Sequence, residues 1–215
     1  MSLVLGHRGL SSSHLENSME AFRAALAAGM DGFELEVQPT LDGVCAVLHD
    51  DTRQRTCLGG GILRKLKAAE LPMLKNGESV PRLGNVLELP AKLINVELKG
   101  EPGWKVALAA VEAADALDRV LFSSFEHSEV LQLWAECPEA RGGFLWESGE
   151  AAELTQDELE DLPERLWLHL PLDAVQARPA FWAPYAARIA LWGMKRAAEA
   201  KALPFEAAVV IADGL

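Results

Sequence analysis

Two histidines of the chain stand where they could exchange protons with a substrate. His7 follows a short apolar run at residues 3–5, and His49 follows another at residues 44–48. An imidazole gains or loses its charge near neutral pH, so a pair of histidines can act as general acid and general base. A lone histidine is more often a satisfied core or surface residue. The positions of these two, flanking an acidic strand, favour a catalytic role.

Three glutamates indicate a site for a divalent cation. Glu34 and Glu36 alternate along the run at residues 32–37, so both point to the same face of a strand. Glu97 ends a later apolar run. A single glutamate at a strand end would most simply face solvent, but three buried together would repel one another. A cation relieves that repulsion, and carboxylate oxygens suit Mg²⁺, Ca²⁺ or Mn²⁺ better than zinc.

Basic and polar residues complete the cluster. Arg8 and Lys99 add two cations, which together with a metal form a pocket suited to phosphate. Glu16 and Asn17 either lead into a helix capped by Ser18 or reach back to hold His7, Arg8 or the metal, and their spacing leaves both roles open. Other residues with open roles are Asp50, which orients His49 or caps the loop, Trp146 and Trp192, which are pocket walls or core, and His169 at a strand end.

The elements that must position these residues alternate between strands and helices. Apolar runs begin at residues 3, 32, 93, 120, 142, 166, 188 and 207. Helices are predicted at residues 19–28, 64–71, 83–89, 104–117, 126–136, 150–162, 174–187 (interrupted by Pro179 and Pro184) and 195–202. Eight strands alternating with helices predict an α/β fold, a (β/α)₈ TIM barrel that makes residues 1–215 one domain.

One apolar run does not fit the parallel pattern. Residues 44–48 follow residue 37 too closely for a parallel crossover, which needs about a dozen residues or more. The Asp42-Gly43 pair between them predicts a hairpin instead. Residues 52–83 are then a short irregular insertion. Because barrel active sites lie at the carboxyl ends of the strands, the polar residues above are expected to meet on one rim.

Composition limits the partners of the chain. The net charge of −12 over 215 residues argues against nonspecific binding to nucleic acid or to an anionic membrane. Three cysteines without metal-like spacing fit a reducing compartment. No leader or membrane-spanning run is evident, so a cytoplasmic protein is expected. Nothing in the sequence indicates an oligomeric state.

Taken together, these motifs resemble the glycerophosphodiester phosphodiesterase family. That family's pattern contains His-Arg-Gly, Pro-Glu-Asn-Thr, Glu-Leu-Asp-Val, Thr-x-Asp-Gly, His-Asp and Glu-Ile-Lys. The chain carries the corresponding segments in the same order, at residues 7–9, 15–18, 34–37, 40–43, 49–50 and 97–99. The match is dense up to residue 100. Beyond it the match thins to residues 123–125, Trp192 and Asp213.

The resemblance implies a barrel enzyme that hydrolyses small glycerophosphodiesters to glycerol 3-phosphate and an alcohol, within lipid and glycerol metabolism. It implies one divalent cation, Mg²⁺ or Ca²⁺ with Mn²⁺ also possible, on Glu34, Glu36 and Glu97. The implied roles of the other residues are catalysis by His7 and His49, phosphate binding by Arg8 and Lys99, and support by Glu16, Asn17, Asp50 and Trp192. Glu36 replaces the family's usual aspartate, which bears on metal preference. Three further departures are Leu15 for proline, Gly193 for threonine after the tryptophan, and Ala212 for threonine.

Several alternatives stay open at this stage. The sequence does not assign acid and base between the histidines, nor decide whether water or the substrate's own 2-hydroxyl is the nucleophile. The short insertion implies an open pocket, which would also suit a lysophospholipase D- or phosphoinositide phospholipase-like enzyme. A noncatalytic glycerophosphodiester-binding protein is disfavoured, because binding alone needs no paired acid and base.

Overall fold

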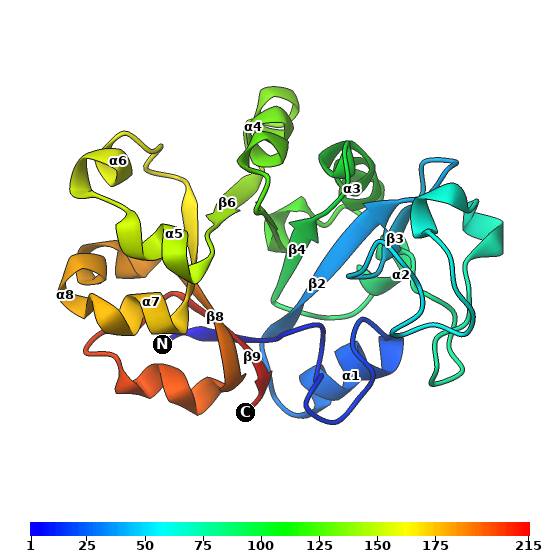
Figure 1. Ribbon diagram of the computed structural model, residues 1–215, viewed down its shortest axis with the longest axis horizontal. Coiled ribbons are helices and arrows are strands. Elements are labelled where there is room, and N and C mark those ends of the chain that lie inside the picture. Colours follow the sequence, from blue (N-terminus) through cyan, green and yellow to red (C-terminus); the bar gives the residue numbers. More distant parts are fainter.

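The computed structural model describes all 215 residues, and its centre is a closed ring of eight parallel strands (Figure 1). The order around the ring is β1-β9-β8-β7-β6-β5-β4-β2, and pairing of β1 with β2 closes it. These strands are β1 (Leu3–Gly6), β2 (Gly32–Pro39), β4 (Leu93–Leu98), β5 (Val120–Ser124), β6 (Arg141–Leu145), β7 (Trp167–Pro171), β8 (Ile189–Arg196) and β9 (Val209–Gly214). The predicted barrel is confirmed.

The strand β3 (Cys45–Val47) lies outside this ring. It runs antiparallel to β2, with Val37 opposite Val47. The turn between them depends on Gly43, whose φ of 77° lies in the left-handed region that glycine adopts without strain. The predicted hairpin is therefore confirmed, and it carries His49 back to the rim of the barrel.

The helices lie on the outside of the ring (Figure 1). They are α1 (Met19–Ala27), α2 (Leu83–Val86), α3 (Gly103–Ala113), α4 (His127–Glu136), α5 (Ser148–Glu153), α6 (Gln156–Glu160), α7 (Leu172–Ala177) and α8 (Pro179–Trp182). Ser18 caps α1 by accepting a hydrogen bond from the backbone of Ala21, as a residue of its type at this position predicts. Short 3-10 helices are η1 (Leu63–Lys65), η2 (Ala68–Glu70), η3 (Leu117–Arg119), η4 (Ala183–Arg188) and η5 (Ala197–Ala202).

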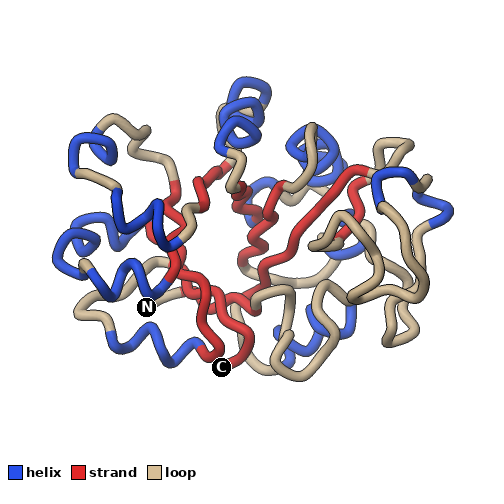
Figure 2. Tube along the Cα trace, viewed as in Figure 1, coloured by secondary structure: helices blue, strands red, loops and turns tan.

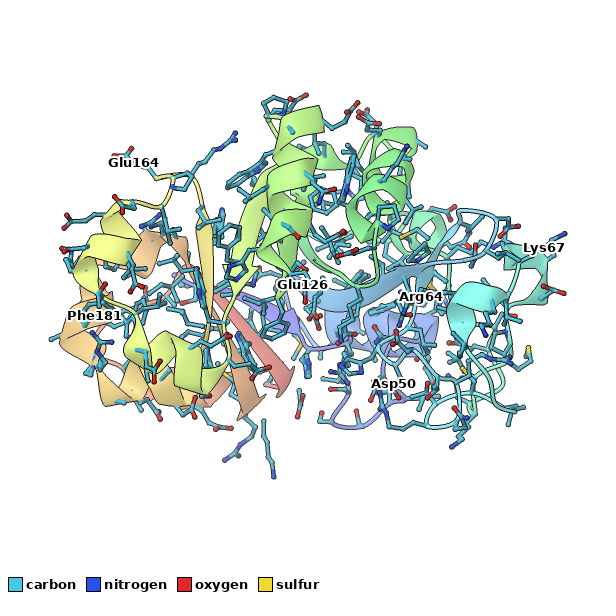
Figure 3. The ribbon with its side chains drawn as sticks, turned by 45° about the horizontal axis from the view of Figure 1, so that its top comes forward. Asp50, Arg64, Lys67, Glu126, Glu164 and Phe181 are labelled. Carbon is cyan, nitrogen blue, oxygen red and sulfur yellow. The ribbon has the colours of Figure 1, made fainter.

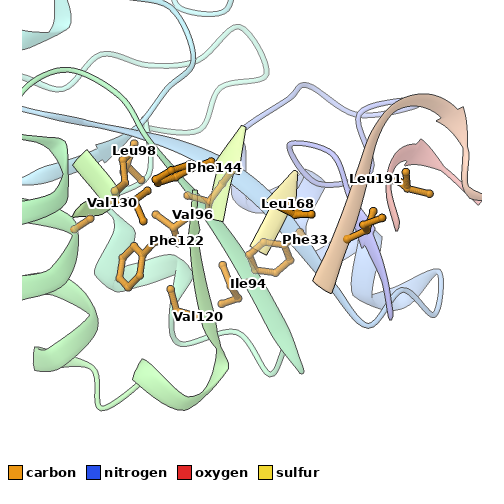
Figure 4. Close-up of a cluster of buried hydrophobic side chains, with 14 of the residues drawn as sticks. Phe33, Ile94, Val96, Leu98, Val120, Phe122, Val130, Phe144, Leu168 and Leu191 are labelled. Atoms are coloured by element: carbon orange, nitrogen blue, oxygen red, sulfur yellow. The ribbon is translucent and has the colours of Figure 1, made fainter. Parts of the chain in front are cut away.

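Side chains alternate between the outer and the inner face of each barrel strand, so the buried apolar residues form two separate clusters. Outward residues such as Phe33, Ile94 and Val96 join a cluster of 42 buried apolar residues between the strands and the helices (Figure 4). Inward residues form a much smaller cluster of 6, which includes Leu5 and Ile211. Because the larger core lies outside the ring, several inward positions are free to carry polar side chains.

The predicted helices at 83–89 and 104–117 end early, at Val86 and Ala113. Four other predicted helices are wrong in extent or type. The expected helix at 150–162 breaks at Leu154, which is extended, and Thr155 caps a new helix by accepting from the backbone of Glu158. Residues 174–187 form α7, α8 and η4, because Pro179 begins α8 and Pro184 stands in the first turn of η4. Residues 64–71 hold only η1 and η2. The expected helix at 195–202 is η5, since β8 continues to Arg196.

The insertion after the hairpin is mostly irregular (Figure 2). Isolated bridges such as Cys57 to Leu74 link its extended segments, and a cluster of 6 buried apolar residues anchors it beside the hairpin. None of the helices combines the length and hydropathy that crossing a bilayer would require.

Candidate active site

A cavity of about 220 Å³ opens at the carboxyl ends of the strands. Eight of the residues singled out from the sequence line it, namely His7, Arg8, Glu34, His49, Glu97, Lys99, His169 and Trp192. Four more (Glu16, Asn17, Glu36 and Asp50) lie behind them and contact them directly. Segments far apart in the sequence therefore meet at one site, as the barrel topology predicts.

Each of the two histidines is held by a carboxylate. Nδ1 of His7 lies 2.8 Å from Oδ1 of Asp213, and Nδ1 of His49 lies 2.5 Å from Oδ1 of Asp50. The hydrogen bond to His7 lowers the pKa of the Asp213 carboxyl, so this group is ionised and accepts the Nδ1 proton. In both pairs the carboxylate orients the ring and leaves Nε2 as the nitrogen available to a substrate.

Three carboxylates lie close together in the wall of the barrel. Glu34 is 4%, Glu36 1% and Glu97 9% exposed, and Glu36 stands opposite Glu97 in the register of β2 and β4. Burial, then Glu36 and Glu97, raise the pKa of Glu34 well above its ordinary value. Burial and Glu36 likewise raise the pKa of Glu97 to about 7, against the opposing effect of Lys99. Arg8 and Lys99 offset this acidic charge only in part, since the pKa values of Glu34 and Glu97 stay raised.

Arg8 is the main cation that faces the acidic cluster. Its backbone N–H donates to Oε2 of Glu34 at 2.9 Å, and its guanidinium donates to Oε1 of Glu16 at 2.8 Å. Its Nε forms an ion pair with Oε1 of Glu36 at 2.7 Å, although the N–H is not aligned on that oxygen. Burial opposes the charge of Arg8, but Glu36, Glu34 and Glu16 together raise its pKa. Lys99 lies 3.6 Å from Glu97.

Arg55 is a residue of the site that sequence reasoning missed. Its guanidinium contacts Oε2 of Glu16 at 2.5 Å and Oδ2 of Asp50 at 2.7 Å. Because Glu16 also holds Arg8 and Asp50 holds His49, Arg55 connects the two sides of the cavity. Hydrogen bonds from Arg55 keep the pKa of Asp50 well below its usual range. Figure 3 shows Asp50 beside the insertion from which Arg55 comes.

Asp213 is the second missed partner. Its position in the last strand matches the family's pattern, but nothing in the local sequence indicated that it would face His7. Pairing of β1 with β9 places Gly6 opposite Ala212, which brings His7 and Asp213 side by side. Ser11 also donates to Asp213, at 3.2 Å.

The donor groups fit a hard divalent cation. Ligand atoms of His7, Glu34 and Glu36 lie within 4.8 Å of one another. Asn17 donates its amide to Glu36 at 2.6 Å, and its own Oδ1 is buried with no protein partner. Oxygen-rich sites of this kind suit Mg²⁺, Ca²⁺ or Mn²⁺. Glu97 lies outside the group of three, beside Lys99.

Aromatic side chains form one wall of the cavity. The ring of Trp192 meets that of Phe125 edge to face, with centroids 5.9 Å apart. Trp146 is instead buried in the core against His127. His169 lines the cavity from β7 and is fully buried.

Comparison with known proteins identifies relatives of the chain. The sequence profile described as the glycerophosphoryl diester phosphodiesterase family matches residues 7–184. A glycerophosphodiester phosphodiesterase of Caldanaerobacter subterraneus subsp. tengcongensis is 34% identical over 69% of this chain and 68% of its own length. Another protein of that name, from Bacillus altitudinis, is 36% identical over 60% of each chain, so less than two thirds of its length is matched.

Solved structures share the fold. A glycerophosphodiester phosphodiesterase of Thermotoga maritima superposes with a TM-score of 0.77 at 28% identity, over 99% of this chain and 95% of that chain. An Oleispira antarctica phosphodiesterase, solved in complex with the product sn-glycerol-3-phosphate, superposes with a TM-score of 0.79 at 23% identity, over 99% of this chain and 93% of that chain.

Proposed function

The chain belongs to the glycerophosphoryl diester phosphodiesterase family, and from this premise we propose that it hydrolyses small glycerophosphodiesters to glycerol 3-phosphate and an alcohol. The predicted family and enzyme class are confirmed by the relatives. The observation that carries the proposal is the pair of carboxylate-held histidines, which line one cavity together with Arg8, Lys99 and Glu34.

The two histidines supply proton transfer. Nε2 of one takes the proton from the nucleophile, which is water or the 2-hydroxyl of the glycerol moiety. The other histidine donates a proton to the oxygen of the leaving alcohol. Asp213 and Asp50 stabilise the imidazolium that forms on each ring, since an ionised carboxylate next to a ring favours its charged form.

The remaining polar groups bind and stabilise the phosphate. Glu34, Glu36 and Glu97 are the proposed ligands of one Mg²⁺, Ca²⁺ or Mn²⁺ ion. Such an ion supplies Lewis-acid stabilisation of charge on the phosphoryl oxygens. Arg8 and Lys99 face the same cavity and bind the nonbridging oxygens. Glu16 fixes the Arg8 guanidinium, and Asn17 fixes the Glu36 carboxylate.

The partner is a small molecule, and the place of action is proposed to be the cytoplasm. The net charge of −12 disfavours nucleic acid and anionic bilayers. A second substrate class, the lysophospholipids, is favoured by one observation: Phe125 is 37% exposed at the cavity and could contact an acyl chain. The same cluster would cleave either substrate.

The test is release of glycerol 3-phosphate from glycerophosphocholine. The protein is assayed with Mg²⁺, Ca²⁺ or Mn²⁺, and again after EDTA. Metal-dependent release that EDTA abolishes supports the reaction and the cofactor together. No release with any of the three ions refutes the glycerophosphodiester proposal, and lysophosphatidylcholine is then the next substrate. Equal rates of release with and without EDTA refute the proposed requirement for a metal ion.

A further inference from the structure

Beneath the carboxylates, the cavity ends in polar groups that the proposed mechanism does not use. Both ring nitrogens of His169 and the Oδ1 atom of Asn95 are buried and have no protein partner. The exposed fraction is 0% for His169 and 1% for Asn95, yet both side chains line the cavity. Leaving buried polar atoms without partners costs free energy, so such groups in a cavity point to a ligand.

The positions of these two side chains are built by the strands. Asn95 precedes Glu97 by two residues on β4, so it lies one inward position deeper in the barrel, about 7 Å below the rim. Its amide donates to Oγ of Ser123 at 2.9 Å, which fixes the amide and leaves Oδ1 free. Ser123 is paired in register with Gly143 on the next strand.

Gly143 makes room for the imidazole of His169. A Cβ atom at residue 143 would lie 2.6 Å from Nε2 of His169, closer than real side chains approach. The absence of a side chain at this position is therefore what lets the ring enter the barrel. His169 and Asn95 thus stand on either side of the Ser123 and Gly143 pair, at the closed end of the cavity.

The chemistry of this closed end selects a neutral, hydroxylated ligand. Burial lowers the pKa of His169 to about 3, so the ring is neutral and offers one donor and one acceptor. Asn95 offers an acceptor. Ile211 and Leu145 line the cavity as well and suit the carbon atoms of a small polyol. The charged groups that suit phosphate, Arg8 and Lys99, belong to the rim.

We infer that His169 and Asn95 bind the hydroxyl groups of the glycerol moiety, and that the alcohol moiety of the substrate leaves through the open end. This inference rests on the proposed function and adds a basis for substrate choice. The closed end accepts one small, constant group through hydrogen bonds. The open end imposes no such requirement, so head groups of different size are accepted there.

The test compares two ligands by calorimetry in the presence of Mg²⁺. Glycerol 3-phosphate and propyl phosphate carry the same phosphate group, but only the first has the two hydroxyls. Wild-type protein is expected to bind glycerol 3-phosphate about 10- to 30-fold more tightly, the size expected for two hydrogen bonds to neutral partners. His169→Leu should reduce this preference to below about threefold and leave the affinity for propyl phosphate unchanged.

Two further variants separate binding from a structural role. His169→Gln, which keeps a donor and an acceptor, should restore most of the preference. His14→Leu is the matched control, because His14 lies outside the cavity in the loop before α1, and both affinities should stay at wild-type values. His169→Leu should unfold at the same or a higher temperature, since it removes unpaired buried nitrogens.

Either of two results overturns the inference: equal binding of both ligands by wild-type protein, or a full preference retained in His169→Leu. Turnover of glycerophosphocholine is measured in parallel on the wild type. Because the binding comparison needs no turnover, either of these two binding results together with normal turnover refutes only the role of His169. Absent turnover with normal binding refutes only the proposed reaction.

Discussion

Replacing Glu97 with glutamine should change how the stability of the metal-free protein depends on pH. Glu97 is buried beside Glu36, and its pKa rises to about 7 from an ordinary 4.5. The folded state therefore binds a proton over a pH range in which the unfolded chain has released it. The stabilisation that this proton contributes is fully present below pH 4.5, and it is lost as the pH rises through 7.

The size of the loss follows from the two pKa values. At about 1.4 kcal/mol per pKa unit, the interval from 4.5 to about 7 corresponds to a loss on the order of 3 kcal/mol. Most of it falls between about pH 5 and pH 8. Glu34 has its pKa raised for the same reasons, so it adds to the effect in the same direction. Glutamine carries no charge at any pH, and the variant should therefore lose much less stability over this range.

The assay is urea unfolding in EDTA at a series of pH values between about 5 and 8. Glu88→Gln is the matched control, since Glu88 is an exposed glutamate on the outside of the barrel. Adding Mg²⁺ near pH 8 should stabilise the wild type by about 3 kcal/mol at a hundredfold excess over the dissociation constant, and the Glu97→Gln variant by less. The reasoning is refuted if the free energy of unfolding of the wild type stays constant or increases with pH. It is also refuted if the free energy of unfolding has the same dependence on pH in the wild type and in Glu97→Gln.

Other substitutions test the remaining groups. His7→Ala and His49→Ala should each lower kcat by roughly 10² to 10⁴ in the glycerophosphocholine assay, and near wild-type rates in both would contradict their roles. Asp213→Asn should lower kcat by roughly tenfold or more with little change in KM, since it removes the charge that orients His7 and stabilises its imidazolium. Arg55→Met should lower unfolding stability by about 1 kcal/mol, because two partly exposed ion pairs are lost, and Arg55→Lys should recover part of the loss. Equal stability of wild type and Arg55→Met in urea would show that the two ion pairs of Arg55 contribute nothing to stability.

Much of the fold and of the site followed from local patterns. The alternation of Glu34 and Glu36 with apolar residues predicted both the strand and its polar inward face, because side chains on a strand alternate between faces. The hairpin followed from the short connection and its glycine. The closed barrel followed from eight predicted strands that alternate with helices, because few fold topologies accommodate that order.

The missed features depend on contacts between distant segments. Arg55 contacts Glu16 across 39 positions, and only the folded insertion sets that pairing. The role of Asp213 depends on which strands close the ring. The breaks at Leu154 and Arg178 reflect local competition, in which caps and prolines ended helices that hydropathy alone would have continued.

The partnership of His7 with Asp213 joins residues 206 positions apart. A growing chain that has emerged only as far as β8 already contains His7, His49 and every carboxylate of the proposed metal site. It still lacks β9, which pairs with β1, and with it Asp213, the carboxylate that orients His7. Contacts between such remote segments form late, because a long loop must close before they contribute. Competence for proton transfer should therefore be among the last properties acquired during synthesis, and an incomplete chain would hold the site's residues without activity.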